Sequence, residues 1–124
     1  MAVVLIVEDE VFIRQNAEWM VEDLGHNALL AGDPDEALAS LCAPGPIDAL
    51  FVDIRLGGVA HGGYAIANHA IQARPRLRVL YTSGSTLTGD MADRFVIGGR
   101  FLQKPYSSEQ LEAALAELLE PVTP

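Results

Sequence analysis

Six side chains suited to chemistry are spread along the chain: two adjacent acids near its start, a third acid, two adjacent hydroxyls and a lysine. They are Glu8, Asp9, Asp53, Thr82, Ser83 and Lys104. Crowded carboxylates repel one another, so they need a cation or a raised pKa, and ligands that are all oxygens suit a hard ion such as Mg²⁺. A carboxylate can also attack phosphorus to give an acyl phosphate. A lysine ammonium and a serine hydroxyl would then hold the phosphoryl oxygens. The set predicts a metal-assisted aspartyl-phosphate site.

Net charge restricts the possible partners. Seventeen acidic and eight basic side chains give a net charge of −9 at pH 7, and such a surface repels DNA and anionic membranes unless basic residues cluster. Only Arg74, Arg76 and Arg78 lie close together, and Lys104 is the only lysine. We therefore expect no direct binding of nucleic acid or membrane, and a basic protein or a cation as partner.

Length and composition indicate one globular domain over residues 1–124, because half of the 124 residues are hydrophobic. The longest apolar run, Ala2 to Val7, is too short to cross a bilayer and lacks the flanks of a signal peptide. We expect a cytoplasmic protein. Cys42 is the only cysteine, which excludes an internal disulfide and a cysteine-type zinc site.

Five short apolar runs predict strands. The run from Ala2 to Val7 is continuous and rich in β-branched residues, as expected for a strand buried on both faces. The run after Gly25 is weaker. The expected strands are residues 2–7, 27–31, 47–52 with Asp53 at its end, 77–82, and 100–103.

Helical patterns fill the intervals between these runs. Asp33, Pro34 and Glu36 form a typical helix start, and Ser107 with Gln110 repeats the capping pattern. A short helix near residues 90–96 is also expected, and the last helix is expected to end at Glu120. The predicted core positions are Ile13, Ala17, Met20 and Leu24 in the first helix, Ala37, Leu38 and Leu41 in the second, Ile66, Ala67, Ala70 and Ile71 in the third, and Leu111, Leu115 and Leu118 in the last.

Strands that alternate with helices predict a parallel sheet covered by helices on both faces. Such sheets bind ligands outside the carboxyl ends of their strands, where the strand order reverses. The first strand ends in Glu8 and Asp9, the third in Asp53, and the fifth in Lys104. The sheet is therefore expected to bring these distant residues to one edge.

In their order and spacing, four motifs resemble those of response-regulator receiver domains, and the resemblance covers nearly the whole chain. The motifs are Leu5-Ile6-Val7-Glu8-Asp9-Glu10, Leu50-Phe51-Val52-Asp53, Leu80-Tyr81-Thr82-Ser83-Gly84 and Lys104-Pro105. The resemblance implies an α/β, flavodoxin-like (βα)5 fold with a doubly wound parallel sheet of order 2-1-3-4-5. It also implies two-component signalling, in which Asp53 takes a phosphoryl group from the phosphohistidine of a histidine kinase or a histidine phosphotransfer protein.

The same resemblance implies a metal site. Asp9 and Asp53 would bind Mg²⁺ (or Mn²⁺) directly, together with the backbone carbonyl of Arg55. Glu8 occupies the other acidic position and would act through a coordinated water. The bond between Lys104 and Pro105 is expected to be cis, as in similar proteins.

Phosphoryl binding and switching are implied for other residues. Ser83 and Lys104 would hold the phosphoryl oxygens, and Phe101 matches an aromatic switch position coupled to Ser83. The surface of the last two helices and the fifth strand would then change shape and bind or release a target protein, with a phosphorylation-dependent homodimer as one possible form. In this family, the positions of Arg55 and Ser85 tune the phosphate lifetime, and Gly84 leaves the approach open.

The loop after Asp53 departs from the family pattern. It reads Leu56-Gly57, where a Leu-Pro or Met-Pro pair is usual, and later His61-Gly62-Gly63, where Asp-Gly is usual. Loss of the proline predicts a more mobile loop and a weaker metal geometry.

Four alternatives stay open on the sequence. A phosphatase with an aspartyl-phosphate intermediate often has an acid two residues after the nucleophile, where this chain has Arg55. A flavin-binding module would need a phosphate loop after the first strand, where Glu8, Asp9 and Glu10 repel phosphate. A degenerate receiver could act by protein contacts alone, and a receiver from a hybrid kinase could act as a phosphate relay or sink. Catalysis is expected only on the chain's own phosphorylation and dephosphorylation.

Overall fold

A single parallel sheet forms the centre of the molecule, for which a computed structural model describes residues 2–58 and 61–120. Within these residues the sheet has five strands in the order β2-β1-β3-β4-β5, all of them paired in parallel. The strands are β1 (Val3–Val7), β2 (Asn27–Ala31), β3 (Ala49–Asp53), β4 (Arg78–Ser83) and β5 (Arg100–Gln103). This confirms the predicted flavodoxin-like topology.

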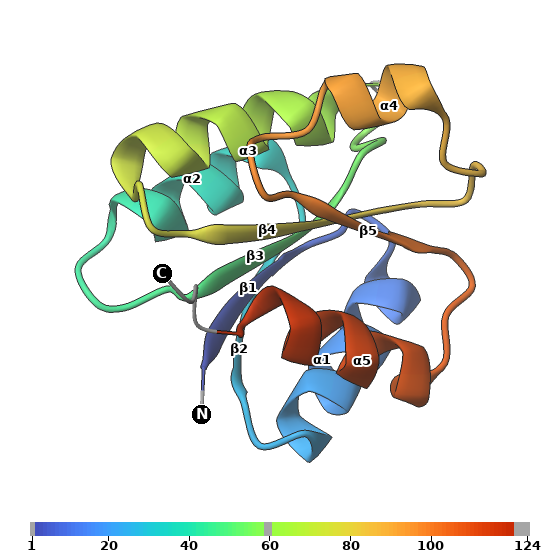
Figure 1. Cartoon of the computed structure of the whole chain (residues 1–124). Helices are drawn as coiled ribbons and strands as arrows, with labels where there is room; N and C mark the ends of the chain where they lie inside the picture. The colour runs from blue at the N-terminus through green and yellow to red at the C-terminus, as the bar shows by residue number, and fades with distance from the viewer. Residues whose placement is uncertain (1, 59–60, 121–124) are drawn as a thin grey trace.

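Helices cover both faces of this sheet (Figure 1). They are α1 (Val11–Asp23), α2 (Pro34–Cys42), α3 (Gly62–Ala73), α4 (Gly89–Asp93) and α5 (Ser108–Leu118). One layer holds α1 and α5, and the other holds α2 and α3, with α4 at its end (Figure 1). The sheet is therefore the middle of three layers, and its polar strand ends are left at one edge.

Alternation along the strands divides the core in two, because successive side chains point to opposite faces. Val4 and Ile6 pack in the cluster with α1 and α5, whereas Leu5 and Val7 pack in the cluster with α2 and α3. Every residue of β3 is buried. In β1 and β3, burial on both faces explains why the sequence is continuously apolar until the chain reaches the functional edge.

Side-chain caps start the helices that border this edge. Glu10 caps α1 and accepts a hydrogen bond from the backbone N–H of Ile13 at 2.9 Å. Ser107 and Gln110 form the predicted reciprocal capping box at α5. At α2, Asp33 is the cap as predicted, but Glu36 accepts from the N–H of Gly32. These caps fix where the chain turns into α1, α2 and α5.

The inward face of α1 differs from the expectation. Ala17 is buried as predicted, and Val21 is buried with it, whereas Ile13, Met20 and Leu24 are only half-buried. Ala17 and Val21 are one helical turn apart and therefore lie one above the other against the sheet. The third and fourth strands also begin two and one residues later than expected, and α5 ends at Leu118.

The connection between β4 and β5 contains a shorter helix than the predicted one near residues 90–96. Tyr81 accepts a hydrogen bond on its phenol oxygen from the backbone N–H of Val96 at 2.9 Å. Phe95 stacks on the Tyr81 ring, with centroids 4.2 Å apart and planes 13° apart. Because these contacts hold Phe95 and Val96 against β4, the helix ends at Asp93.

Two of the three neighbouring arginines support helix ends. Arg74 donates to the backbone carbonyls of Leu41, Ala43 and Gly45 around the end of α2. Arg78 donates to the carbonyls of Leu118 and Glu120 at the end of α5. Helix carbonyls without intrahelical partners need such donors. Within the described residues, no helix has both the length and the apolar character to span a membrane.

Replacing Ser107 with Ala tests how α5 is positioned after Lys104. The change removes the acceptor of the Gln110 N–H, now 3.1 Å away, and should lower the free energy of unfolding by about 1 kcal/mol. Urea denaturation followed by circular dichroism measures this. Ser108→Ala, at the first helical position, is the control and should change it by less than about 0.5 kcal/mol. Equal losses in both variants would contradict the capping role.

Candidate functional site

The carboxyl ends of four strands bring the predicted site residues to one edge of the sheet. Parallel register aligns Val7 with Val52, the residue before Asp53, and aligns Asp53 with Thr82. The same register aligns Ser83 with Gln103, the residue before Lys104. Residues that follow paired positions emerge side by side, so the fold itself places the acids, the hydroxyls and the ammonium together.

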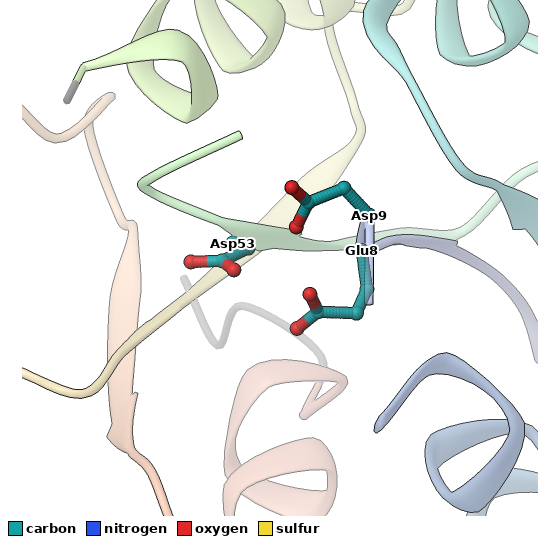
Figure 2. A group of neighbouring side chains, drawn as sticks. All are labelled: Glu8, Asp9 and Asp53. Carbon is teal, nitrogen blue, oxygen red and sulfur yellow. The ribbon is translucent and has the colours of Figure 1, made fainter. Parts of the chain in front are cut away.

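Three carboxylates gather at this edge (Figure 2). Glu8 and Asp9 come from the end of β1 and Asp53 from the end of β3, and each offers an oxygen within 4.8 Å of the others. Glu8 is only 4% exposed and Asp53 only 6%, whereas Asp9 is exposed. An all-oxygen donor set of this kind fits a hard divalent cation.

Lys104 joins the buried carboxylates. Its ammonium donates to Glu8 Oε1 at 2.6 Å and to Asp53 Oδ2 at 2.8 Å. Lys104 follows β5 and Asp53 ends β3, so the lysine side chain has to cross the end of β4 to reach Asp53. The structure thus brings together the residues on which the sequence interpretation depended, and the peptide bond between Lys104 and Pro105 is cis as expected.

The ammonium only partly balances the carboxylates. Burial alone would lower the pKa of Lys104, but hydrogen bonds to Asp53 and Glu8, with the negative charge of both, outweigh burial and raise it. Burial also raises the pKa of Glu8 against the opposing hydrogen bond from Lys104. Three carboxylates lie near one ammonium, which bonds only Glu8 and Asp53, so this group keeps an excess of negative charge that a bound cation would neutralise.

Backbone donors arrange the remaining oxygens. Asp53 Oδ1 accepts a hydrogen bond from the N–H of Arg55 at 3.1 Å, and Asp9 Oδ2 accepts one from Gly57 at 3.0 Å. Ser83 Oγ accepts from the N–H of Ser85 at 3.1 Å. These contacts connect the acids and the serine to the loops after β3 and β4, so loop movement and site geometry are coupled.

A cavity of about 410 Å³ opens above these groups. Its lining includes most of the predicted site residues, but neither Phe101 nor Thr82: Glu8, Asp9, Asp53, Arg55, Ser83, Gly84, Ser85 and Lys104. Phe101 instead lies half-buried on β5, paired with Tyr81 in the sheet and packed against Phe95. It is outside the cavity, on the side of the sheet that carries α3 and α4.

Sequence reasoning missed the part played by Gly63. A Cβ there would collide with the carbonyl oxygen of Asp53 and lie 2.7 Å from the Cα of Ile54. The Gly63 N–H donates to the Ile54 carbonyl at 2.8 Å. The sequence interpretation placed Gly63 in a loop made more mobile by the loss of a proline, yet Gly63 lets the start of α3 pack directly on the end of β3. Val59 and Ala60 of this loop lie outside the described residues.

Tyr106 is a second residue that the motifs did not single out. Its ring packs against Phe51, with centroids 5.6 Å apart, and Phe51 lies two residues before Asp53. Burial raises the pKa of the Tyr106 phenol, and the charges of Glu8 and Asp53 add to this. The ring therefore holds the turn after Lys104 against β3. The signal that the sequence offered for this role was an aromatic residue two positions after Lys104.

Lys104→Met tests the charge balance. At pH 7 it leaves Glu8 and Asp53 buried without their counter-ion, and breaking such a pair costs about 3–5 kcal/mol of unfolding free energy. Burial raises the folded-state pKa of an unpaired carboxyl above its unfolded value. For Glu8 the unfolded value is about 4.5. Its stabilising contribution is therefore present below that value and lost as pH rises through the folded pKa. The deficit of the variant should shrink as pH falls from 7 toward 4.5.

Chemical denaturation at a series of pH values measures this deficit. The control is Arg76→Met, which removes a positive charge from an exposed position and should give a small loss that changes little over the same range. A Lys104→Met deficit that stays constant from pH 7 to 4.5 would argue against the buried pairing.

Gly63→Ala tests the close approach of α3 to β3. The atoms that the new Cβ would meet are backbone and cannot swing away, so we expect a loss of about 1–3 kcal/mol in unfolding free energy. Gly89→Ala is the control, because a Cβ there meets nothing within 4 Å. Thermal denaturation compares the two, and a Gly63→Ala variant as stable as the unmodified chain would refute the packing constraint.

Comparison with known proteins agrees with this geometry. A family model described as the response regulator receiver domain matches residues 4–116. Protein PilG of Pseudomonas aeruginosa is 29% identical over 124 residues, which cover 98% of this chain and 90% of PilG. Sensor histidine kinase AruS of the same organism is 30% identical over 120 residues, which cover 93% of this chain but only 12% of AruS.

Solved structures show the same architecture. A response regulator receiver protein from Sinorhizobium medicae superimposes with a TM-score of 0.85 at 26% identity, covering 95% of this chain and 94% of that one. NtrX from Brucella abortus gives a TM-score of 0.84 at 30% identity, covering 95% of this chain and 27% of NtrX. The chain therefore belongs to the response regulator receiver domain family of two-component signalling.

Proposed function

We propose that this receiver domain accepts a phosphoryl group on Asp53 from the phosphohistidine of a histidine kinase or a histidine phosphotransfer protein. One observation carries the proposal: the ammonium of Lys104, the chain's only lysine, lies 2.8 Å from Asp53 Oδ2 in a pocket with two further carboxylates. A cation fixed beside an acid in an acidic pocket is the arrangement that phosphoryl transfer to a carboxylate needs.

Asp53 acts as the nucleophile. One of its carboxylate oxygens attacks phosphorus as the P–N bond of the phosphohistidine breaks, and the electron pair of that bond returns to the imidazole nitrogen of the donor. A carboxylate needs no base to remove a proton first. The product is an acyl phosphate on Asp53, and Lys104 and Ser83 lie beside it to hold its phosphoryl oxygens.

Glu8, Asp9 and Asp53 are the residues that would hold Mg²⁺ or Mn²⁺, with the backbone carbonyl of Arg55 as a further ligand and Glu8 acting through a water. The spacing of the three carboxylates supports this assignment. A bound divalent cation supplies positive charge to the phosphoryl oxygens. The protein's own part is to keep these oxygens together although they repel one another.

Phosphorylation would then reshape a protein-binding surface. A phosphoryl group adds about −1.5 to −2 charges, which can bias two packings that differ by a few kcal/mol. Ser83 would move toward the phosphate and Phe101 would turn inward, which changes the face formed by α4, β5 and α5. The half-buried ring of Phe101 and the single backbone contact of the Ser83 hydroxyl support this coupling.

The lifetime of the acyl phosphate would be set by residues at the cavity mouth. Arg55, Gly84 and Ser85 line the cavity, and all three are exposed. At Gly84, a Cβ would meet nothing within 4 Å. These positions would control how water approaches the phosphoryl group from the side opposite Asp53.

The chain would act on itself and not turn over external phosphate esters, because Arg55 occupies the position where a second acid catalyst is often found. Its partners would be a kinase or phosphotransfer protein, a downstream target, and in one form a second copy. A relay or sink role within a kinase system is the second candidate, and the match to a segment of the sensor histidine kinase AruS favours it.

Acetyl phosphate with Mg²⁺ tests the proposal without a partner kinase. The unmodified chain should gain the mass of one phosphoryl group, as acetate leaves with the electron pair of the broken P–O bond. The adduct should be stable in acid and labile in alkali, and Asp53→Asn should abolish it. Intact-protein mass spectrometry gives the readout.

Asp93→Asn is the matched control, because Asp93 is an exposed aspartate at the end of α4. It should be phosphorylated as the unmodified chain is. Retention of the adduct in Asp53→Asn would reject Asp53 as the acceptor. No adduct on any form, with Mg²⁺ present, would favour a receiver that acts by protein contacts alone.

A further inference from the structure

Thr82 carries a buried hydroxyl without a partner. The residue is 3% exposed, and within residues 2–58 and 61–120 its Oγ1 is the buried side-chain polar atom that lacks a hydrogen bond. Leaving such a group unpaired destabilises a folded protein, and almost all buried polar atoms are paired. A valine of the same shape would fill this position without the penalty, so the hydroxyl needs another explanation.

The sheet register places Thr82 beside the proposed phosphoryl acceptor. Thr82 pairs with Asp53 on one side and with Leu102 on the other. Paired residues of neighbouring strands send their side chains to the same face, on backbones about 4.8 Å apart. Because Lys104 crosses the end of β4 to reach Asp53, Thr82 lies next to the ion pair between them. Ser83 points to the opposite face and already accepts a hydrogen bond from Ser85.

In the resting site the Thr82 hydroxyl makes no hydrogen bond, to Asp53 or to any other group of the described residues. Asp53 Oδ1 accepts from the N–H of Arg55 and Oδ2 accepts from Lys104. Phosphoryl transfer to Asp53 changes this, because the new phosphoryl oxygens draw the ammonium toward themselves. The carboxyl oxygen that Lys104 leaves then lacks a donor, and the hydroxyl that lacks an acceptor is one strand away.

We propose that Thr82 is a positioning residue for the phosphorylation of Asp53: its hydroxyl donates to the Asp53 carboxyl oxygen once Lys104 turns to the phosphoryl group. This inference rests on the proposed function. A hydrogen bond made in the transition state and product, but not in the resting state, accelerates the reaction. The free-energy penalty of the unpaired hydroxyl is then present in the resting state and removed during phosphoryl transfer.

This role separates stability from rate, which a merely structural role would not do. Before phosphorylation, Thr82→Val should have the same melting temperature as the unmodified chain or a higher one, because the buried unpaired hydroxyl is gone. The same variant should react with acetyl phosphate and Mg²⁺ about tenfold more slowly, the effect of about one hydrogen bond. Thr82→Ser, which keeps the hydroxyl, should restore most of the rate.

Three further measurements complete the experiment. Mg²⁺ affinity by calorimetry should be the same in Thr82→Val and the unmodified chain, because the carboxylates are untouched. Thr86→Val, at an exposed threonine of the following loop, should keep the rate of the unmodified chain. Asp53→Asn should show no reaction, which establishes that the measured rate belongs to Asp53.

Each outcome decides between the two proposals. If the unmodified chain reacts at Asp53 and Thr82→Val reacts equally fast, the role of Thr82 is rejected and the receiver function stands. A slow Thr82→Val that also melts lower, or a Thr82→Ser that is as slow as Thr82→Val, would show that packing matters and not the hydroxyl. If the unmodified chain does not react, or if Asp53→Asn does, the receiver function itself fails and the inference fails with it.

Discussion

A single ammonium group holds two buried carboxylates together at the carboxyl edge of the sheet. Lys104 is 96 residues from Glu8 and 51 from Asp53 along the chain, yet it donates to both at 2.6 and 2.8 Å. The sheet meets that constraint by setting the ends of β1, β3 and β5 at one edge. The packing of both core layers therefore maintains a pair of buried carboxylates that would be strongly unfavourable without the ammonium of Lys104.

The same arrangement explains why the site suits a charged ligand. Three carboxylates stand against one ammonium, and the burial of Glu8 raises its pKa because water no longer stabilises its charge. Under the proposed function, a divalent cation would reduce the repulsion, and a phosphoryl group would give Lys104 a third anion to bind besides Glu8 and Asp53. Metal, lysine and phosphoryl group would then neutralise one another's charges within one site.

Much of this could be predicted from the sequence, because the signals were local. The bounds of β2 and β5 were correct, since an apolar run flanked by turn residues indicates a strand by itself. The meeting of Glu8, Asp53 and Lys104 followed from a general rule about parallel sheets. That rule needs only the strand order and the residue at each strand end.

The missed features depend on tertiary contacts that leave no local signal. A glycine needed for close packing looks like a glycine of a mobile loop, which is why the role of Gly63 was not recognised. The length of α4 depends on a phenol oxygen in β4 that binds the chain fifteen positions later. Thr82 belonged to a recognised motif, but the lack of a partner is visible only when its surroundings are known.

The contacts that Tyr81 makes with Phe95 and Val96, just after α4, have a consequence for recognition. A helix of five residues presents too few turns for a regular stripe of side chains, so the outline of this region is set by the ring that holds it from beneath. Under the proposed function, the surface that a binding protein would meet between α4 and β5 is thus shaped by Tyr81, a buried residue that such a protein would not touch. Specificity among related signalling pairs can accordingly drift through changes in the core while the exposed residues stay the same.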